Sequence, residues 1–317
     1  MQRFLRGLRI GLIGLATLAL AGYGVAYGLS QRMLHRTYEA PLAAFSVPND
    51  PALLGEGERL ARIHSCFFCH GDTLQGTVHV DQPFLVRIVA PGLTRIVREY
   101  SDAELERVIR RGVRRDGRSV WAMPSTMYYH LSDEDLGALL AYLRSVELRE
   151  GLATEFRPRL LARLMIAAGN ARPLAAQIDT TIPRPALDRH DPLALGRYLA
   201  LTSCSGCHGA DLRGGNRGRA PDLRIGGAFT PDAFIRLMRE GVGSGGRELR
   251  LMGGVARSGF RHFTDAEITA LYAYLRSLAA AGEQTNPLSA PPFGGSTSQG
   301  VDNGPKRVSA HQPPNEG

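Results

Sequence analysis

The hydrophobic and polar positions along the chain divide it into one long apolar stretch near the N-terminus and a series of short amphipathic stretches after it. Residues 10–30 carry no charge and consist mainly of apolar or small side chains, with arginines on both sides. About 20 residues of this kind cross the hydrocarbon layer of a bilayer as a helix. The pattern therefore predicts an N-terminal transmembrane helix within residues 1–36.

A cleavable signal peptide is the alternative interpretation of the N-terminus. Ala19-Leu20-Ala21 resembles the small-residue site at which such peptides are cut. The apolar run continues beyond that site to Leu29, so cleavage there would leave an apolar end on the mature chain. We favour an uncleaved anchor, and both interpretations place the rest of the chain outside the cytoplasm.

The amphipathic stretches that follow occur as two copies in the same order, which indicates an internal repeat. Residues 57–61 and 196–200 both read Gly-x-x-Leu-Ala. Farther along, residues 101–112 and 230–241 begin with Ser or Thr and end with Gly. These residue types are typical of the two ends of a helix. Each copy is therefore expected to contain at least these two helices.

A closing helix completes each copy. Its last residues, Ala-Tyr-Leu-Arg-Ser, are identical at 141–145 and 273–277. Strand signals are scarce between the predicted helices. The sequence therefore predicts an all-α fold with two tandem domains of one type, at residues 50–148 and 190–282.

Two further segments lie outside the repeat. Residues 149–189 are rich in Arg, Ala and Pro and form a predicted linker, with a helix expected over Leu160–Ala168. Residues 283–317 are dominated by Pro, Gly, Ser, Asn and Gln and contain few large apolar side chains. Such a segment cannot bury enough apolar surface to offset the entropy of ordering, so a disordered tail is predicted.

Length and charge narrow the function classes. The chain has 317 residues, which suits two modest domains with additional segments. Its formal net charge of +8 raises the question of nucleic acid binding. The basic residues are scattered among acidic ones and Lys306 is the only lysine, so the charge indicates an arginine-rich solvated surface. No nucleic acid partner is predicted.

The candidate chemistry lies in the four cysteines, which form two Cys-x-x-Cys-His motifs at matching places of the two copies. This motif is typical of covalent haem c attachment, in which both thiols form thioethers to one porphyrin and the histidine binds its iron. Two covalently bound haem c groups are the expected cofactors. The predicted attachment residues are Cys66, Cys69, His70, Cys204, Cys207 and His208.

A redox disulfide in each motif, or one zinc ion bound by four thiolates, is the alternative interpretation of the cysteines. Neither alternative gives the two adjacent histidines a role. A redox Cys-x-x-Cys pair is expected near a βαβ pattern, which is missing from this chain. A single zinc site would leave the duplicated flanking sequences unexplained.

Each copy resembles a class I cytochrome c domain, over residues 50–148 and 190–282. The resemblance rests on a helix before Cys-x-x-Cys-His, a loop after it and a closing helix with the Ala-Tyr-Leu-Arg signature. It implies that a proline carbonyl accepts a hydrogen bond from the iron-binding imidazole, and Pro91 and Pro221 match that proline. It also implies a methionine as the sixth iron ligand, from the loop before the last helix.

That loop in the first copy contains two methionines. The family's Met-Pro step matches Met123, so Met123 is the expected ligand and Met127 the reserve. Trp121, the sole tryptophan, is expected either near a haem edge or in the core.

In the second copy the loop at residues 251–254 offers Met252, which lacks the following proline. Met238 is expected to pack in the core from the preceding helix. His130 and His262, just before the closing helices, would provide bis-histidine ligation instead. We interpret these two histidines as surface or cap residues, because the family ligand usually lies earlier in the loop.

The resemblance implies outer-sphere electron transfer, because an iron with both axial positions filled leaves substrate no direct route to the metal. We expect an electron carrier rather than an enzyme, relaying electrons from a dehydrogenase or quinol-linked donor to an oxidase or another cytochrome. The alternative is a dihaem enzyme of the peroxidase or thiosulfate-oxidising type, which needs an open or labile iron position. The expected partners are redox proteins and the membrane. The expected location is the bacterial inner membrane, with the haem domains in the periplasm.

Overall fold

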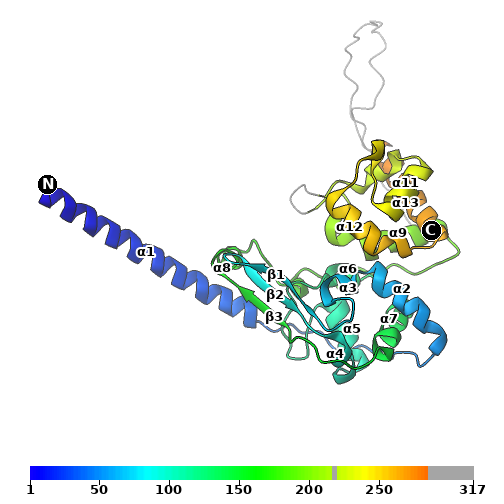
Figure 1. The fold of residues 1–317 in the computed structure, drawn as a ribbon, viewed down its shortest axis with the longest axis horizontal. Coiled ribbons are helices and arrows are strands. Elements are labelled where there is room, and N and C mark those ends of the chain that lie inside the picture. The colour runs from blue at the N-terminus through cyan, green and yellow to red at the C-terminus, as the bar shows by residue number, and fades with distance from the viewer. Residues whose placement is uncertain (216–219, 285–317) are drawn as a thin grey trace, which may run out of the picture.

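In the computed structural model, a long N-terminal helix projects from the first of two stacked, mainly helical domains (Figure 1). The structure describes residues 1–215 and 220–284. The predicted disordered tail therefore lies outside the described residues, except for its first two positions, which belong to the last helix. The predicted all-α fold class is confirmed, since the described residues are mostly helical with few strands.

Helices α2, α3, α5 and α7 have counterparts in the same order later in the chain, namely α9, α10, α11 and α13. The first part contains α1 (Gln2–His35), α2 (Leu54–Ile63), α3 (Cys66–His70), β1 (Thr77–Gln82), β2 (Val86–Ala90), α4 (Leu93–Glu99), α5 (Asp102–Arg111), α6 (Ser125–Tyr128) and α7 (Asp133–Ser145). The second part contains β3 (Glu155–Pro158), α8 (Leu160–Ala167), α9 (Pro192–Leu199), α10 (Ser205–His208), α11 (Pro231–Glu240), α12 (Arg250–Ser258) and α13 (Asp265–Gln284). Short 3-10 or π turns are η1 (Pro51–Leu53), η2 (Leu174–Ala176), η3 (Ala200–Cys204), η5 (Leu223–Ala228), η6 (Ser244–Gly246) and η7 (Phe260–His262).

The helix ends expected from capping residues are confirmed. The Ser101 side chain accepts a hydrogen bond from the Glu104 backbone N–H, and the Glu104 side chain accepts one from the Ser101 backbone N–H, at the start of α5. This reciprocal arrangement satisfies two donors that a helix start otherwise leaves unpaired. Gly112 and Gly241 end α5 and α11 in the left-handed conformation, with φ of 65° and 77°. Glycine adopts this conformation at no steric cost.

Each domain is framed by its first and last helices, which cross at a glycine. A Cβ built on Gly57 of α2 would lie 2.1 Å from the carbonyl oxygen of Ala138 in α7. A Cβ on Gly196 of α9 would likewise lie 2.1 Å from the carbonyl oxygen of Ala270 in α13. The Gly-x-x-Leu-Ala repeat therefore marks the point where two helix backbones meet, and the following leucine and alanine are buried in both copies.

A small sheet corrects the expectation that strands play no part in the first domain. β1, β2 and β3 form an antiparallel sheet in that order, with Ile88 of β2 opposite Phe156 of β3. β3 comes from the predicted linker, which thus contributes to the first domain as well as joining the two. The pairing of β2 with β3 could not be predicted from short-range patterns, because more than sixty residues of chain separate the two strands. The hairpin of β1 and β2 is local, and the sequence analysis overlooked it.

α1 stands largely clear of both domains, and its apolar side chains are exposed over most of its length. Its length and composition are sufficient to cross a membrane. The helix expected in the linker is present as α8, which packs against the C-terminal part of α1.

Candidate functional site

The first Cys-x-x-Cys-His motif forms α3, immediately after α2. Ser65 separates the two helices in a left-handed conformation, with φ of 58°. Because residues three apart lie on the same side of a helix, the single turn of α3 points Cys66 and Cys69 in the same direction. His70 follows directly at the end of the turn.

A cavity of about 480 Å³ opens against this motif. Its volume falls in the range of roughly 300–1,000 Å³ that is usual for cofactor pockets. Apolar side chains from α4, α5, α7 and the sheet form most of its wall. The wall includes the predicted site residues of the first domain, Cys66, Cys69, His70, Pro91 and Met123, together with Trp121.

The backbone of the Ala-Pro-Gly segment fixes the imidazole of His70. Nδ1 of His70 lies 2.7 Å from the carbonyl oxygen of Pro91. Because a carbonyl can only accept a hydrogen bond, Nδ1 carries the proton and Nε2 keeps its lone pair for a metal. Burial also lowers the pKa of His70, which favours the neutral imidazole that iron requires.

The two methionines of the first loop lie in different places. Met123 is half-buried in the loop before α6 and lines the cavity. Met127 is buried outside the cavity and packs toward the second motif, where a Cβ built on Gly206 would lie 3.1 Å from its sulfur. The Met-Pro step in the sequence already favoured Met123 as the ligand, whereas the place of Met127 depends on the contact between the two domains.

Trp121 also lines the cavity, and its ring stacks on Phe156 of β3 at a centroid distance of 5.2 Å and an angle of 13°. Phe156 and Tyr128 are further aromatic residues of the wall. Sequence reasoning missed both as site residues. Phe156 lies in the predicted linker, so only the pairing of β3 with β2 reveals its place in the site.

The second motif follows α9 through the π turn η3 and ends in α10. Nδ1 of His208 lies 2.8 Å from the carbonyl oxygen of Pro221, so this pair repeats the His70–Pro91 arrangement. Cys204 is buried and Cys207 is exposed. Both motifs therefore present an imidazole whose free nitrogen is Nε2.

The expectation that Met252 lies in a loop is corrected, since residues 250–258 form helix α12. Gly253 and Ala256 are buried, and Met252 and Val255 are partly buried against the core of the second domain. This spacing of three and four residues is that of a helix face. Cys204 and Met252 contact the same apolar cluster.

Neither His130 nor His262, the two histidines considered for bis-histidine ligation, lines the cavity of the first site. His130 is half-buried outside the cavity, where burial and then the charge of Arg197 lower its pKa. The carbonyl of His262 accepts a hydrogen bond from Arg59 at 3.1 Å. Met238 is buried in the core, as expected.

The donor set fits haem c and does not fit a single zinc site. Among residues 1–215 and 220–284, no three His, Cys, Asp or Glu side chains are grouped so that they could bind a metal ion. Burial raises the pKa of the Cys66 and Cys204 thiols to about 12, which disfavours the thiolate form that zinc binds. In the first domain, the cavity brings two thiols, one oriented imidazole and one thioether sulfur to an apolar space. These are the groups that attach and ligate haem c.

Comparison with known families matches both domains. Residues 52–143 match the family "Cytochrome C oxidase, cbb3-type, subunit III", and residues 193–279 match the family "Cytochrome c". The chain is a c-type cytochrome with two cytochrome c domains. Such domains bind haem c covalently.

Curated relatives of this cytochrome include cytochrome subunits of dehydrogenases. The gluconate 2-dehydrogenase cytochrome c subunit of Pantoea cypripedii is 26% identical over 72% of this chain and 60% of its own length. The fructose dehydrogenase cytochrome subunit of Gluconobacter japonicus is 27% identical over 73% of this chain and 53% of its own length. The alcohol dehydrogenase (quinone) cytochrome c subunit of Gluconobacter oxydans is 24% identical over 77% of this chain and 58% of its own length. The cytochrome thus spans less than two thirds of each of these relatives.

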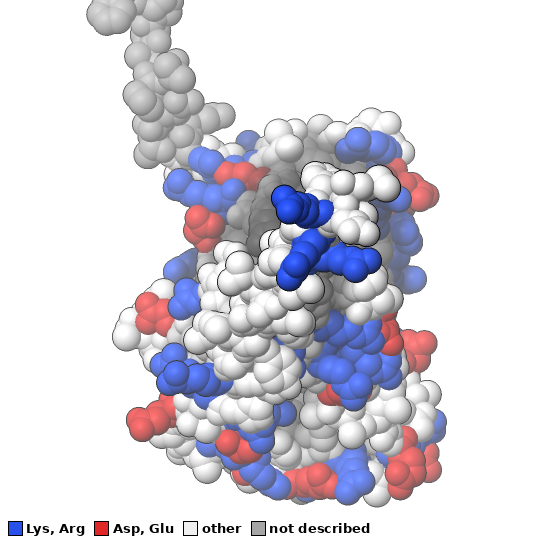
Figure 2. Space-filling view, turned by 90° about the vertical axis from the view of Figure 1, so that its left-hand side faces the viewer, with Lys and Arg blue, Asp and Glu red and all other residues white. Residues whose placement is uncertain are grey.

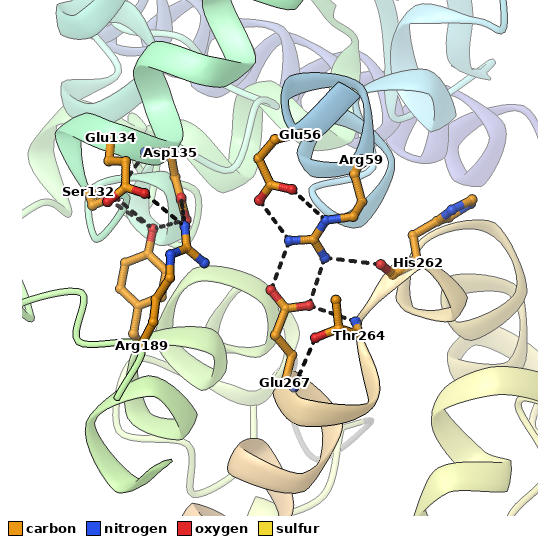
Figure 3. A network of polar contacts seen from close by, with 10 residues as sticks. Glu56, Arg59, Ser132, Glu134, Asp135, Arg189, His262, Thr264 and Glu267 are labelled. Atoms are coloured by element: carbon orange, nitrogen blue, oxygen red, sulfur yellow. Dashed lines mark hydrogen bonds and ion pairs between the residues drawn. The ribbon is translucent and has the colours of Figure 1, made fainter. Parts of the chain in front are cut away.

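The two domains of the cytochrome contact each other through equivalent positions of the repeat (Figure 3). Arg59, the third residue of Gly-x-x-Leu-Ala in α2, donates two hydrogen bonds to the Glu267 carboxylate, at 2.7 and 2.9 Å. Tyr198, the third residue of the same pattern in α9, donates one to Asp135 at 2.7 Å. Glu267 and Asp135 both occupy the third position of a closing helix, after the capping residues Thr264 and Ser132. The interface is therefore close to two-fold symmetric, as expected when a repeated unit packs against its copy.

Electrostatics strengthens one half of this interface. Burial by itself would lower the pKa of Arg59, but hydrogen bonds to Glu56 and Glu267 outweigh it and raise the pKa. Burial raises the pKa of Asp135, although Tyr198 and Arg189 both stabilise its charged form. Arg59 therefore stays fully charged between two carboxylates, and this ion pair crosses from one domain to the other.

The same interface brings the two haem-attachment motifs together. The ring of His64 hydrogen-bonds the backbone of Thr202. Each of these residues lies two positions before the first cysteine of its motif. Nδ1 of His64 is buried without a partner, so Nε2 donates to the Thr202 carbonyl.

Proposed function

We propose that this cytochrome is a membrane-tethered electron carrier with two covalent haem c groups. Its cysteines provide the thioether attachments, and His70 and His208 bind the iron from one side. Met123 and Met252 are the proposed ligands on the other side, and Pro91 and Pro221 orient the two histidines. When bound, haem c supplies a one-electron Fe(III)/Fe(II) couple.

The observation that carries this proposal is the composition of the first cavity. Its wall combines both thiols of one motif, an imidazole with a fixed tautomer and the Met123 sulfur. A methionine ligand favours the reduced iron and raises the reduction potential relative to a second histidine. The cavity wall is mainly apolar, and the proposed axial pair leaves no position for a substrate. These features support electron transfer rather than catalysis.

Contact between the motifs supports a relay within one molecule. The hydrogen bond from His64 to Thr202 joins the segments that carry Cys66 and Cys204. Met127 packs beside Gly206 at the same boundary. These contacts hold the two attachment segments next to each other, so an electron can enter through one domain and leave through the other.

The names of the relatives favour a dehydrogenase as the electron donor. The three relatives are cytochrome subunits of a gluconate, a fructose and an alcohol dehydrogenase. We propose a membrane-bound dehydrogenase, or a quinol-linked donor, on one side and an oxidase or another cytochrome on the other. The relatives' names give no support to a dihaem enzyme of the peroxidase or thiosulfate-oxidising type.

We propose that α1 anchors the cytochrome in the bacterial inner membrane, with both domains in the periplasm. Arginines at positions 3, 6 and 9 precede the uncharged run of α1. Positively charged residues next to a membrane span are retained on the cytoplasmic side. The domains follow the other end of α1 and would therefore lie on the opposite side of the membrane.

Redox titration of the purified full-length cytochrome, with ferric absorption spectra, tests the proposal. We expect two haems per chain, both low-spin with methionine ligation. Met123→His and Met252→His should each lower one potential, by on the order of 0.1 V within the roughly 0.8 V range that axial ligands span, and spare the other. Met127→Leu and Met238→Leu are the matched controls and should leave both potentials unchanged. A high-spin haem that binds added ligands and turns over peroxide would support the enzyme instead.

A further inference from the structure

A set of exposed apolar side chains lies beside the point where α1 joins the rest of the molecule. Leu160, Leu161 and Leu164 of α8 are 44%, 48% and 42% exposed. Phe84, in the turn between β1 and β2, is 71% exposed. The Leu161 backbone N–H donates to the Phe84 carbonyl at 3.0 Å, so these residues form one surface. We call Phe84, Leu160, Leu161 and Leu164 the α8 patch.

α8 is fixed to the C-terminal part of α1. The Arg163 guanidinium lies 4.0 Å from the centre of the Tyr27 ring. The same side chain donates to the Ser30 hydroxyl at 2.9 Å. Ser30 is fully buried at this contact, although most of α1 is exposed. The level of α8 along α1 is therefore set by Tyr27 and Ser30.

The length of the uncharged run in α1 shows where α8 lies relative to the lipid bilayer. A helix rises 1.5 Å per residue, so residues 10–30 span about 30 Å, the thickness of the hydrocarbon layer. The run is just long enough to cross the layer, so its far end at Ser30 lies at the outer boundary of the layer. Tyr27 lies within the last turn before this boundary, and tyrosine is enriched there in membrane proteins.

We propose that the α8 patch inserts into the outer boundary of the lipid bilayer beside α1. This inference rests on the proposed role of α1 as a membrane anchor. Apolar side chains at this level bury their surface among acyl chains, as in helices that lie in the membrane interface. Arg163 extends from the same helix, and its guanidinium lies against the Tyr27 ring and the Ser30 hydroxyl at the outer end of the uncharged run. A long basic side chain at this depth can keep its charge at the interface while its stem lies among apolar groups.

The surface around the patch fits a lipid interface. Figure 2 looks onto the side from which α1 projects toward the viewer, so the largely uncharged side chains at the centre of the view belong to α1. Arg32 and His35 lie in the last turn of α1, and Arg157 is 70% exposed just before α8. Basic side chains at this level are attracted to lipid phosphates.

The insertion would fix the first domain relative to the membrane. The cavity of that domain is lined by Gln31, Leu34 and His35 of α1 and by Arg163 of α8, as well as by the haem-attachment motif. The first site would therefore lie next to the bilayer surface. The second domain, stacked on the far side in Figure 1, would stay in water.

Thiol accessibility in vesicles tests the inference. The four native cysteines are thioethers in the haem-loaded protein, so Leu161→Cys or Leu164→Cys introduces a single free thiol. Each variant is reconstituted at full length into phosphatidylethanolamine–phosphatidylglycerol vesicles and treated with a charged, water-soluble maleimide. The control is Ile225→Cys in the second domain, where Ile225 is 57% exposed.

We expect the patch thiols to react at least about tenfold more slowly than the Ile225→Cys thiol, since a rise of one pKa unit in apolar surroundings already removes nine tenths of the thiolate. A lipid-soluble maleimide meets the same loss of thiolate but concentrates in the lipid layer, so it should narrow the difference between the patch thiols and the Ile225→Cys thiol. The haem spectrum of each variant confirms that it has folded.

The outcomes separate this inference from the anchor on which it rests. Release of the chain from vesicles by an alkaline wash would overturn both the anchor and the insertion. Retention of the chain with equal maleimide rates at all three sites would overturn the insertion alone. The patch thiols could instead be protected only at high protein density, with Leu161→Cys forming disulfide-linked dimers on oxidation. That result would show that the patch binds a second copy of the chain and would also overturn the insertion.

Discussion

Among single residues, His64 has an unusual environment for a titratable group. Its ring is buried between the two domains, donates to the Thr202 backbone and packs edge-on against Tyr128 at 6.0 Å. The Tyr128 hydroxyl donates in turn to the His64 carbonyl at 2.6 Å. Burial lowers the pKa of His64 to about 4, and the hydrogen bond to Thr202 offsets this only in part. The folded protein therefore holds His64 neutral.

The pH dependence of stability follows from this shift. Between pH 6.5 and about 4 the unfolded chain binds a proton at His64 and the folded chain does not, so stability falls as pH falls through this window. Between pH 7 and 5 the wild type should lose about 2 kcal/mol more than His64→Gln, whose amide can still donate to Thr202. Urea unfolding at the two pH values measures the difference.

His190→Gln is the control for this experiment, because His190 is exposed. This variant should keep the pH dependence of the wild type. An identical loss of stability in the wild type and in His64→Gln would show that His64 is not held neutral by burial.

At the scale of elements, the crossing of the first and last helices organises each domain. α2 against α7 and α9 against α13 bring backbones together at Gly57 and Gly196. Side chains that follow, Leu60 and Leu199, are buried on the same face. The haem-attachment motif begins directly after α2 in one copy and after α9 and η3 in the other. The crossing therefore positions the motif as well as the core.

Glycine-to-alanine variants within α2 test this role. Gly57→Ala places a methyl group 2.1 Å from the Ala138 carbonyl oxygen, so the helices must separate. We expect a loss of about 1–3 kcal/mol in the free energy of unfolding, the usual cost of overpacking. Gly55→Ala, in the same helix with no atom within 4 Å, should be neutral or stabilising by up to about 1 kcal/mol. Thermal unfolding of the two variants compares them, and equal stabilities would contradict the crossing.

At the scale of the whole molecule, the repeat interface makes one unit of the two domains. Arg59 with Glu267 and Tyr198 with Asp135 join each first helix to the closing helix of the other domain. Figure 3 shows the two groups of contacts side by side across the boundary. The His64–Thr202 contact lies in the same boundary, so the two pairs also help to hold the two haem-attachment motifs next to each other.

A double-mutant cycle on Arg59 and Glu267 measures the strength of one half of the interface. Their side chains are 20% and 7% exposed and form a two-pronged ion pair. We expect a coupling energy of about 1–3 kcal/mol in urea unfolding of the intact chain, as for buried charged hydrogen bonds. Arg95 and Glu99, 67% and 47% exposed, are the control pair and should couple by about 0.5 kcal/mol or less. Equal coupling in the two pairs would mean that the domains are held by other contacts.

Much of the fold could be predicted from local sequence. The capped ends of α5 and α11 were predicted correctly because a cap acts within one helical turn. The duplicated Cys-x-x-Cys-His motifs and their flanks indicated two cytochrome c domains, since the chemistry of haem attachment requires its groups within five residues. The apolar run of α1 could likewise be identified from composition alone.

Contacts between distant segments decided the rest. The Met-Pro step favoured Met123 for the first cavity, but only the packing of the second domain explains why Met127 lies beside Gly206 instead. Phe156 enters the site only because β3 returns from the linker to pair with β2. Met252 lies in a helix rather than a loop because one face of residues 250–258 packs on the core. Such contacts form only when the chain has folded. Periodicity and capping signals within one segment therefore cannot predict them.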